Sequence, residues 1–230
     1  MIFSDILRTS STDYPGRLCA VLFTAGCPFR CHYCHNPELV LPNKISNKGF
    51  SEEEVLALLD KRKNLVDAVT ISGGEITLHN SLLNFIKKLK SKGYLVKIDT
   101  NGVNPEMVKE LLPFVDYVAM DVKAVLETEH YIETVGTDVD MNKIKESIRL
   151  IIDYGVEHEF RTTVVPSLFP KHLFHSLGGE LEGAKRHIIQ GFKNGKTLNP
   201  DYSGMRMHTE SELEEIRKIM SCYVDDVKIR

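Results

Sequence analysis

Residues 26–36 read Gly26-Cys27-Pro28-Phe29-Arg30-Cys31-His32-Tyr33-Cys34-His35-Asn36, which places three cysteines within eight residues. Thiolates at this spacing can converge only if the chain curls tightly around one centre. Iron–sulfur cubes are held by cysteine thiolates, and four are needed to cover four irons. Because no fourth cysteine lies nearby, a cube bound here would keep one iron with an open coordination site. A substrate can fill that site.

Two other kinds of centre also use clustered cysteines. A zinc ion could take the three thiolates and either His32 or His35, although zinc loops more often come as paired two-cysteine knuckles. A cluster that only transfers electrons normally has a cysteine on every iron. The remaining cysteines are Cys19 and Cys222, and the polar connection over 39–50 contains none, so we expect at most one cluster. An odd, clustered set of five cysteines is typical of metal binding in a reducing compartment.

Strand-like and helix-like segments alternate on both sides of the cysteine segment. The strand-like segments are short apolar runs at 18–24, 68–72, 94–100, 117–121, 158–165 and within 183–190. The helix-like segments have apolar residues at helical spacing and span 50–65, 80–92, 105–112, 142–154 and 210–220. This alternation predicts an α/β fold with a mostly parallel sheet and outer helices. Six strands are too few for a closed eight-stranded barrel, so we predict a partial, open (β/α)6 barrel in a single domain over 1–230.

Polar or glycine-rich residues recur at the carboxyl end of nearly every predicted strand. Besides the cysteine segment, these ends are Gly73-Gly74-Glu75, Asp99-Thr100-Asn101-Gly102, Asp121-Val122-Lys123 and Arg161-Thr162-Thr163. In parallel α/β folds the site lies at that edge of the sheet. We therefore expect these segments to gather around one site.

The composition excludes several other classes of protein. The chain has 230 residues, of which 42% are hydrophobic and 27% charged, a balance typical of globular proteins. A formal charge of −3, without a local Lys/Arg-rich run, gives no reason to expect nucleic acid as a partner. No apolar run approaches the ~18 residues of a membrane span. The first residues lack the basic and apolar regions of a signal peptide, so we expect a cytoplasmic protein without a membrane partner.

With these motifs the chain resembles the radical S-adenosylmethionine (SAM) superfamily. Its signature is three cysteines at this spacing with an aromatic residue, here Tyr33, directly before the third. Within the superfamily the chain is most similar to the activating enzymes of glycyl radical enzymes. The closest group is the activating protein of anaerobic ribonucleoside-triphosphate reductase, with pyruvate formate-lyase activating enzyme as near kin. The segments that carry this resemblance are 12–17, 34–37, 99–102, 121–123 and 161–166.

The resemblance implies a set of cofactor ligands. Cys27, Cys31 and Cys34 would bind one [4Fe-4S] cluster, and SAM would chelate the fourth iron. The residues that would contact SAM, or a monovalent cation beside it, are Tyr33 at the adenine, Gly73, Gly74 and Glu75 at the methionyl ammonium, Asp99 and Asp121 at the ribose or the cation, and Lys123 at the carboxylate. Each also has an ordinary structural interpretation, such as packing for the tyrosine, a turn for the glycines or capping for the aspartates.

Other residues near the strand ends are less clearly assigned. Arg161 could be a buried partner of the aspartates. His187 and Gln190 fall where the last predicted strand should end, and relatives carry a histidine in that neighbourhood. Ile76 stands where the family prefers proline. The histidines at 79, 130, 158, 172, 175 and 208 are expected on the surface.

The resemblance also implies a reaction. A flavodoxin or ferredoxin would supply one electron, SAM would be cleaved to methionine and a 5′-deoxyadenosyl radical, and the radical would remove hydrogen from a glycine of a partner enzyme. Two alternatives remain open from the sequence. One is a radical SAM enzyme acting on a small molecule, such as a deazapurine-forming enzyme. The other is a non-catalytic zinc or electron-transfer module.

Overall fold

Eight strands form one sheet in the computed structural model, which describes residues 1–41 and 49–230. Their spatial order is β10 (Asp226–Ile229), β9 (Arg186–Gly191), β8 (Glu157–Val164), β7 (Tyr117–Asp121), β6 (Leu95–Thr100), β5 (Ala68–Gly73), β3 (Cys19–Thr24) and β2 (Asp5–Ser10). All neighbours are parallel except β2, which is antiparallel to β3. The six predicted strands are β3 and β5 to β9, and they are contiguous in the sheet. The edge strands β2 and β10 were not predicted.

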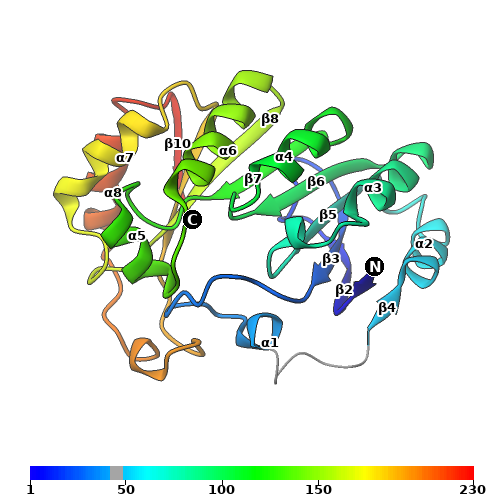
Figure 1. Ribbon diagram of the computed structural model, residues 1–230, viewed down its shortest axis with the longest axis horizontal. Coiled ribbons are helices and arrows are strands. Elements are labelled where there is room, and N and C mark those ends of the chain that lie inside the picture. Colours follow the sequence, from blue (N-terminus) through cyan, green and yellow to red (C-terminus); the bar gives the residue numbers. More distant parts are fainter. Residues whose placement is uncertain (42–48) are drawn as a thin grey trace.

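The helices lie mainly on one side of this curved sheet. Figure 1 shows them arranged around the sheet, with the cysteine segment on its other side. The covering helices are α2 (Glu52–Asp60), α3 (Leu82–Ser91), α4 (Pro105–Leu111), α6 (Met141–Tyr154), α7 (Phe174–Glu180) and α8 (Glu210–Met220). The sheet does not close on itself, because β2 and β10 are its two ends. The predicted partial barrel with outer helices is thereby confirmed.

The remaining elements are short. They are α1 (Pro37–Val40), α5 (Thr128–Val135), the 3-10 turns η1 (Ile76–Leu78), η2 (Leu112–Phe114), η3 (Lys171–Leu173) and η4 (Pro200–Tyr202), and an antiparallel pair of β1 (Ile2–Phe3) with β4 (Phe50–Ser51). Most of the connection predicted over 39–50 lies outside the described residues. No helix within 1–41 or 49–230 is long and apolar enough to cross a membrane.

Local sequence explains where the helices begin and what they cover. Ser51 and Glu54 form the predicted capping box, with the Ser51 hydroxyl accepting from the Glu54 N–H at 3.2 Å and the Glu54 carboxylate accepting from the Ser51 N–H at 2.8 Å. The predicted helix 50–65 is nevertheless shorter, since Phe50 and Ser51 pair as a strand and the helix ends at Asp60.

The two faces of the sheet have different character. On β6, Val96 and Ile98 are fully buried in the apolar core shared with the helices. Lys97 and Asp99 alternate with them and point into the barrel, where Lys97 is only 2% exposed and forms an ion pair with Asp99. On β6, charged side chains therefore face the inside of the barrel, and apolar side chains face the helices.

One histidine departs from its expected place. His158 is 2% exposed, not on the surface, because β8 directs it into the core. Its Nδ1 lies 2.8 Å from the Val156 carbonyl oxygen, and its Nε2 accepts from the Lys185 N–H at 3.1 Å. These two bonds satisfy both ring nitrogens, so His158 has a structural role.

Candidate functional site

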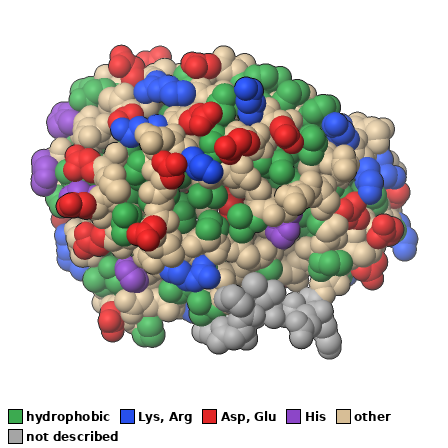
Figure 2. Space-filling view, viewed as in Figure 1, with side chains coloured by type: hydrophobic (Ala, Val, Ile, Leu, Met, Phe, Trp, Pro, Cys, Tyr) green, Lys and Arg blue, Asp and Glu red, His purple; other side chains and the backbone are tan. Residues whose placement is uncertain are grey.

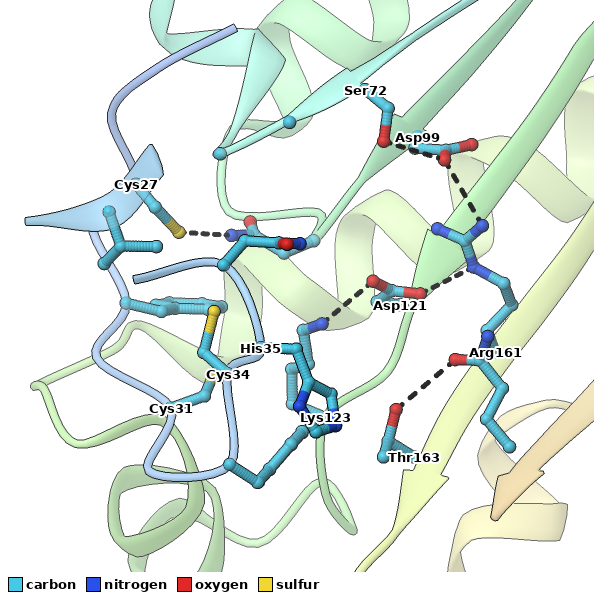
Figure 3. Close-up of a pocket in the computed structure, with 18 of the residues that line it drawn as sticks. Cys27, Cys31, Cys34, His35, Ser72, Asp99, Asp121, Lys123, Arg161 and Thr163 are labelled. Atoms are coloured by element: carbon cyan, nitrogen blue, oxygen red, sulfur yellow. Dashed lines mark hydrogen bonds and ion pairs between the residues drawn. The ribbon is translucent and has the colours of Figure 1, made fainter. Parts of the chain in front are cut away.

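A cavity of about 470 Å³ lies at the carboxyl ends of the parallel strands, as expected. Figure 3 shows its lining, with the cysteine segment on one side and side chains from β6, β7 and β8 on the other. The predicted site residues that line it are Cys27, Cys31, Tyr33, Cys34, Gly73, Gly74, Asp99, Asp121 and Lys123. Nine of the ten predicted residues are thus brought together, and the exception is Glu75.

The three thiols differ from the other two cysteines in position. Burial raises the pKa of Cys27 to about 11 and that of Cys31 to about 12, so both stay neutral unless positive charge is bound beside them. The irons of a cluster would supply that charge. Cys19 is buried at the start of β3 away from the cavity, and Cys222 is exposed after α8.

A cube and a single metal ion make different demands on their ligands. Zinc needs its ligands within about 2.3 Å of one point. Among the described residues, no group of three or more His, Cys, Asp or Glu side chains is placed to hold one metal ion. In a cluster each thiolate binds a different iron, so three thiols that line one cavity are a suitable set of ligands.

A segment far along the chain holds the cysteine loop from outside. This segment, residues 192–202 after β9, is called the strap below. The Leu198 N–H donates to the Cys34 carbonyl at 2.8 Å, and the Asn199 N–H donates to the His32 carbonyl at 3.0 Å. The strap therefore fixes the backbone on both sides of Tyr33.

Two ring stacks add to these backbone bonds. The rings of His32 and Tyr202 stack with centroids 5.5 Å apart, and those of His35 and Phe192 stack at 5.8 Å. The His35 Nδ1 also lies 2.8 Å from the Lys196 carbonyl oxygen. Because a carbonyl only accepts, Nδ1 carries the proton in this contact. The strap thus orients both histidines that flank the last two cysteines.

The glycine pair after β5 is required by close backbone packing. Gly73 has φ +123, and a Cβ there would lie 2.2 Å from the Thr24 carbonyl oxygen. A Cβ on Gly74 would lie 1.9 Å from the Gly26 carbonyl oxygen. The strand end therefore rests directly on the backbone that leads into the cysteine loop, and any side chain would push the two apart.

Glu75 lies behind the cavity wall and not in the lining. It is fully buried, and its carboxylate accepts from the Thr77 N–H and hydroxyl at 3.0 and 2.6 Å, from the Thr100 hydroxyl at 2.7 Å and from the Asn101 N–H at 2.7 Å. This position differs from the expected direct contact with an ammonium group. In the structure Glu75 joins the strand ends of β5 and β6.

Asp121 and Asp99 share one arginine. The Arg161 Nε lies 2.6 Å from Asp121 and its Nη1 lies 3.3 Å from Asp99, while Lys123 binds Asp121 at 2.8 Å (Figure 3). Burial alone would raise the pKa of Asp121, but the Arg161 guanidinium and the Lys123 ammonium outweigh it and hold that pKa well below its usual range. The pKa of Asp99 is likewise lowered, because Arg161 and Lys97 outweigh its burial. Both carboxylates are therefore charged at neutral pH.

Tyr33 offers an unpaired polar atom to the cavity. Its side chain is 5% exposed, and its hydroxyl is buried without a hydrogen-bond partner in the described structure. Burial raises its pKa well above the usual value, so it remains protonated. A buried hydroxyl without a partner is costly, and a molecule bound in the cavity could supply the partner.

Several lining residues were not predicted or were predicted without a role. Gln190 lines the cavity and bonds Thr163 at 3.3 Å, whereas His187, three residues earlier, is buried beside Thr162 and does not line it. Strand alternation separates the two, because residues an odd number apart face opposite sides of a sheet. Lys193 of the strap adds a cation whose position no local pattern indicates.

The visible surface gives no sign of a single-charge patch. Over the face seen in Figure 2, acidic and basic side chains are interspersed.

Comparisons with known proteins identify the family of the chain. The Radical SAM superfamily model matches residues 21–177. A Methanocaldococcus jannaschii protein, provisionally named a glycyl-radical enzyme activating enzyme, is 36% identical over 236 residues, or 100% of this chain and 95% of that one. The pyruvate formate-lyase-activating enzyme of Clostridium pasteurianum is 32% identical over 161 residues, or 68% of this chain and 65% of that one.

A solved structure supports the fold. A domain of pyruvate-formate lyase-activating enzyme from Bacteroides vulgatus has a TM-score of 0.57 at 17% identity, over 71% of this chain and 98% of that domain. The likeness concerns the fold alone. Because the family model spans more than half of the chain and the M. jannaschii relative matches along nearly its whole length, the chain belongs to the radical SAM superfamily, among the relatives of the glycyl-radical enzyme activating enzymes.

Proposed function

We propose that this chain, acting as a single radical SAM domain, installs a glycyl radical in a partner enzyme, with anaerobic ribonucleotide reductase as the first candidate. Family membership implies a [4Fe-4S] cluster and SAM as cofactors. Cys27, Cys31 and Cys34 would hold the cluster, which when reduced supplies the electron that cleaves SAM to methionine and a 5′-deoxyadenosyl radical. The observation that carries the proposal is that these thiols share one cavity with charged strand ends.

The cavity suits the charges of SAM. SAM carries an ammonium, a sulfonium and a carboxylate. The lining holds two carboxylates, Asp99 and Asp121, together with four cationic side chains, those of Lys123, Arg161, Lys193 and Arg230. We propose that Gly73 and Gly74 present backbone groups to the methionyl part and that Tyr33 flanks the adenine. Glu75 would act through the position of these strand ends. A monovalent cation could bind the carboxylate of Asp99 or of Asp121, which would then contact both the cation and Arg161.

The test is anaerobic incubation of the iron-loaded protein with dithionite and SAM, with and without the candidate reductase. We expect methionine and 5′-deoxyadenosine, together with a glycyl radical signal by electron paramagnetic resonance (EPR) only when the reductase is present. Cleavage without any glycyl radical would favour a different protein partner or a small-molecule substrate. No cleavage, with zinc bound in place of iron, would contradict the proposal. Once cleavage with dithionite is seen, flavodoxin and ferredoxin can be compared as native electron donors.

The charged strand end of β7 should contribute to SAM affinity. Asp121→Asn and Lys123→Ala each remove one charge that lines the cavity. A lost charge-assisted contact is worth about 1.5–3 kcal/mol, so the dissociation constant of SAM should rise roughly ten- to a hundredfold, as measured by equilibrium dialysis. Lys145→Ala, which removes the surface ion pair with Glu180 on the outer helices, is the control and should bind as wild type does. Unchanged affinity in both cavity variants would make these charges structural.

The strap should protect a bound cluster. Tyr202→Ala removes the ring that stacks on His32, whereas Tyr202→Phe keeps it. Because the stack restrains the loop between Cys31 and Cys34, the alanine variant should lose iron to a chelator several times faster, followed by visible absorbance. The phenylalanine variant should match wild type. His175→Ala, which breaks a comparable contact with Tyr223 elsewhere, should also match it, and equal rates in all four proteins would contradict this role.

The five cysteines of the chain provide ligands for one cluster. Cys19 and Cys222 lie apart from the cavity and from each other, and the sequence has no further cysteine. The reconstituted protein should therefore contain about four irons per chain. About eight irons, with two distinct reduced-cluster spectra, would show that other ligands had been overlooked.

A further inference from the structure

One cysteine sulfur accepts a hydrogen bond from a side chain of another strand end. The Asn101 Nδ2 lies 3.8 Å from the Cys27 Sγ, the contact drawn in Figure 3 between the cysteine loop and the end of β6. Asn101 is 5% exposed and lines the cavity. Within 1–41 and 49–230, neither Cys31 nor Cys34 has a side-chain donor to its sulfur. The three thiols are therefore not equivalent.

The orientation of this amide is set by its other partner. The Val103 N–H donates to the Asn101 Oδ1 at 3.1 Å. An N–H cannot pair with an amide NH₂, so the oxygen must face Val103 and the NH₂ must face the sulfur. The Asn101 backbone N–H also donates to the buried carboxylate of Glu75 at 2.7 Å. Both the backbone and the amide are thus held in place by the protein.

The Cys27 sulfur also accepts a backbone hydrogen bond from Phe29, in addition to that from Asn101. Hydrogen bonds to ligand sulfurs stabilise negative charge on them. Reducing a cluster adds one electron and increases that charge, so such donors raise the reduction potential. Among the residues that the structure describes, the amide of Asn101 is the donor to Cys27 that a side-chain substitution can remove.

We propose that Asn101 is a positioning residue that raises the reduction potential of the cluster through its hydrogen bond to Cys27. The inference rests on the proposed cluster site. The reaction in question is the one-electron reduction of the oxidised cluster by dithionite. No bond forms or breaks, and the cluster keeps its ligands. Asn101 also connects this sulfur to Glu75 and, through β6, to Asp99 in the same cavity. Asn101 would therefore act on the reduction potential of the cluster from the edge of the sheet that carries the charged strand ends.

The test is an anaerobic EPR redox titration without SAM. Asn101→Asp keeps the size of the side chain and an acceptor for Val103 but replaces the donor to Cys27 with an acceptor. At the wild-type midpoint potential, the ratio of reduced to oxidised cluster should fall about tenfold or more, as expected for losing a hydrogen bond to a charged group. Asn101→Ala removes the donor without adding charge and should shift the ratio in the same direction.

The chain offers a matched control three residues away. The amide of Asn104 donates to the Thr77 carbonyl at 3.0 Å and accepts from the Met107 N–H at 3.2 Å, without touching a sulfur. Asn104→Asp introduces the same change of charge nearby and should shift the ratio much less.

The titration distinguishes a failure of this inference from a failure of the proposed function. If wild-type protein binds no cluster, the function proposed above fails. If wild type and both Asn101 variants bind about four irons and share one midpoint potential, only the present inference is overturned. If both Asn101 variants lose iron while Asn104→Asp keeps it, Asn101 is needed for assembly, and a tuning role is likewise overturned.

Discussion

Cys31→Ala protein is expected to show no SAM cleavage above the level of a protein-free control. Cys31 is the most buried of the three loop thiols, and it lines the same cavity as the other two. With two thiolates a cube has two irons without protein ligands, and the chelation of SAM at one defined iron is lost. The measurement is 5′-deoxyadenosine formed per hour under anaerobic conditions with excess dithionite. Cys27→Ala and Cys34→Ala should behave in the same way.

The other two cysteines provide the controls. Cys19→Ala removes a thiol that packs beside Tyr14 and Tyr117 at the opposite end of the strands, so cleavage should continue with at most a modest loss of stability. Cys222→Ala changes an exposed residue and should have no effect. Wild-type cleavage by Cys31→Ala protein would show that the ligand assignment is wrong. Loss of cleavage in Cys19→Ala protein that remains folded would show that the site extends beyond the loop.

The six central strands could be predicted because each is a short apolar run followed by a polar or glycine-rich end. The two edge strands, β2 and β10, could not be predicted in this way. Most of β2 is at least partly exposed, so it lacks the apolar run of a central strand, and β10 has only four residues. Helix α7 was missed because Gly178 and Gly179 lower its intrinsic propensity. The structure explains Gly178, since a Cβ there would lie 2.2 Å from the ring of Tyr223.

The candidate site was predictable where it depends on strand ends and not where it depends on long-range contacts. The rule that parallel strands carry their site at one edge brought together residues from Cys27 to Lys123. The strap joins the cysteine loop from more than 150 residues away through backbone bonds and ring stacks, and neither leaves a periodic pattern. The place of Glu75 also depended on three-dimensional context, because only the fold brings Thr100 and Asn101 to its carboxylate.

Arg161→Met should be the most destabilising change among the charged residues of the cavity. The side chain of Arg161 is 13% exposed and bridges Asp99 and Asp121, so its removal leaves two neighbouring carboxylates with one lysine each. Breaking a buried ion pair from one side costs about 3–5 kcal/mol. Because Lys97 and Lys123 remain, we expect a loss of about 3 kcal/mol in the free energy of unfolding at pH 7, measured by urea unfolding.

The pH dependence gives this prediction a second measurement. In wild-type protein the pKa values of Asp99 and Asp121 are lowered by folding, so their contribution to stability is present above the unfolded pKa of about 3.9 and is lost as the pH falls below it. Arg161→Met removes a main cause of these low pKa values, the guanidinium that both carboxylates share. The gap in stability between the two proteins should therefore be full at pH 7 and narrow as the pH falls below about 4. Arg217→Met, which breaks an exposed pair with Glu214, should show little change at either pH. A gap that stays constant down to pH 3.5 would mean that Arg161 stabilises the protein by packing and not by holding these carboxylates charged.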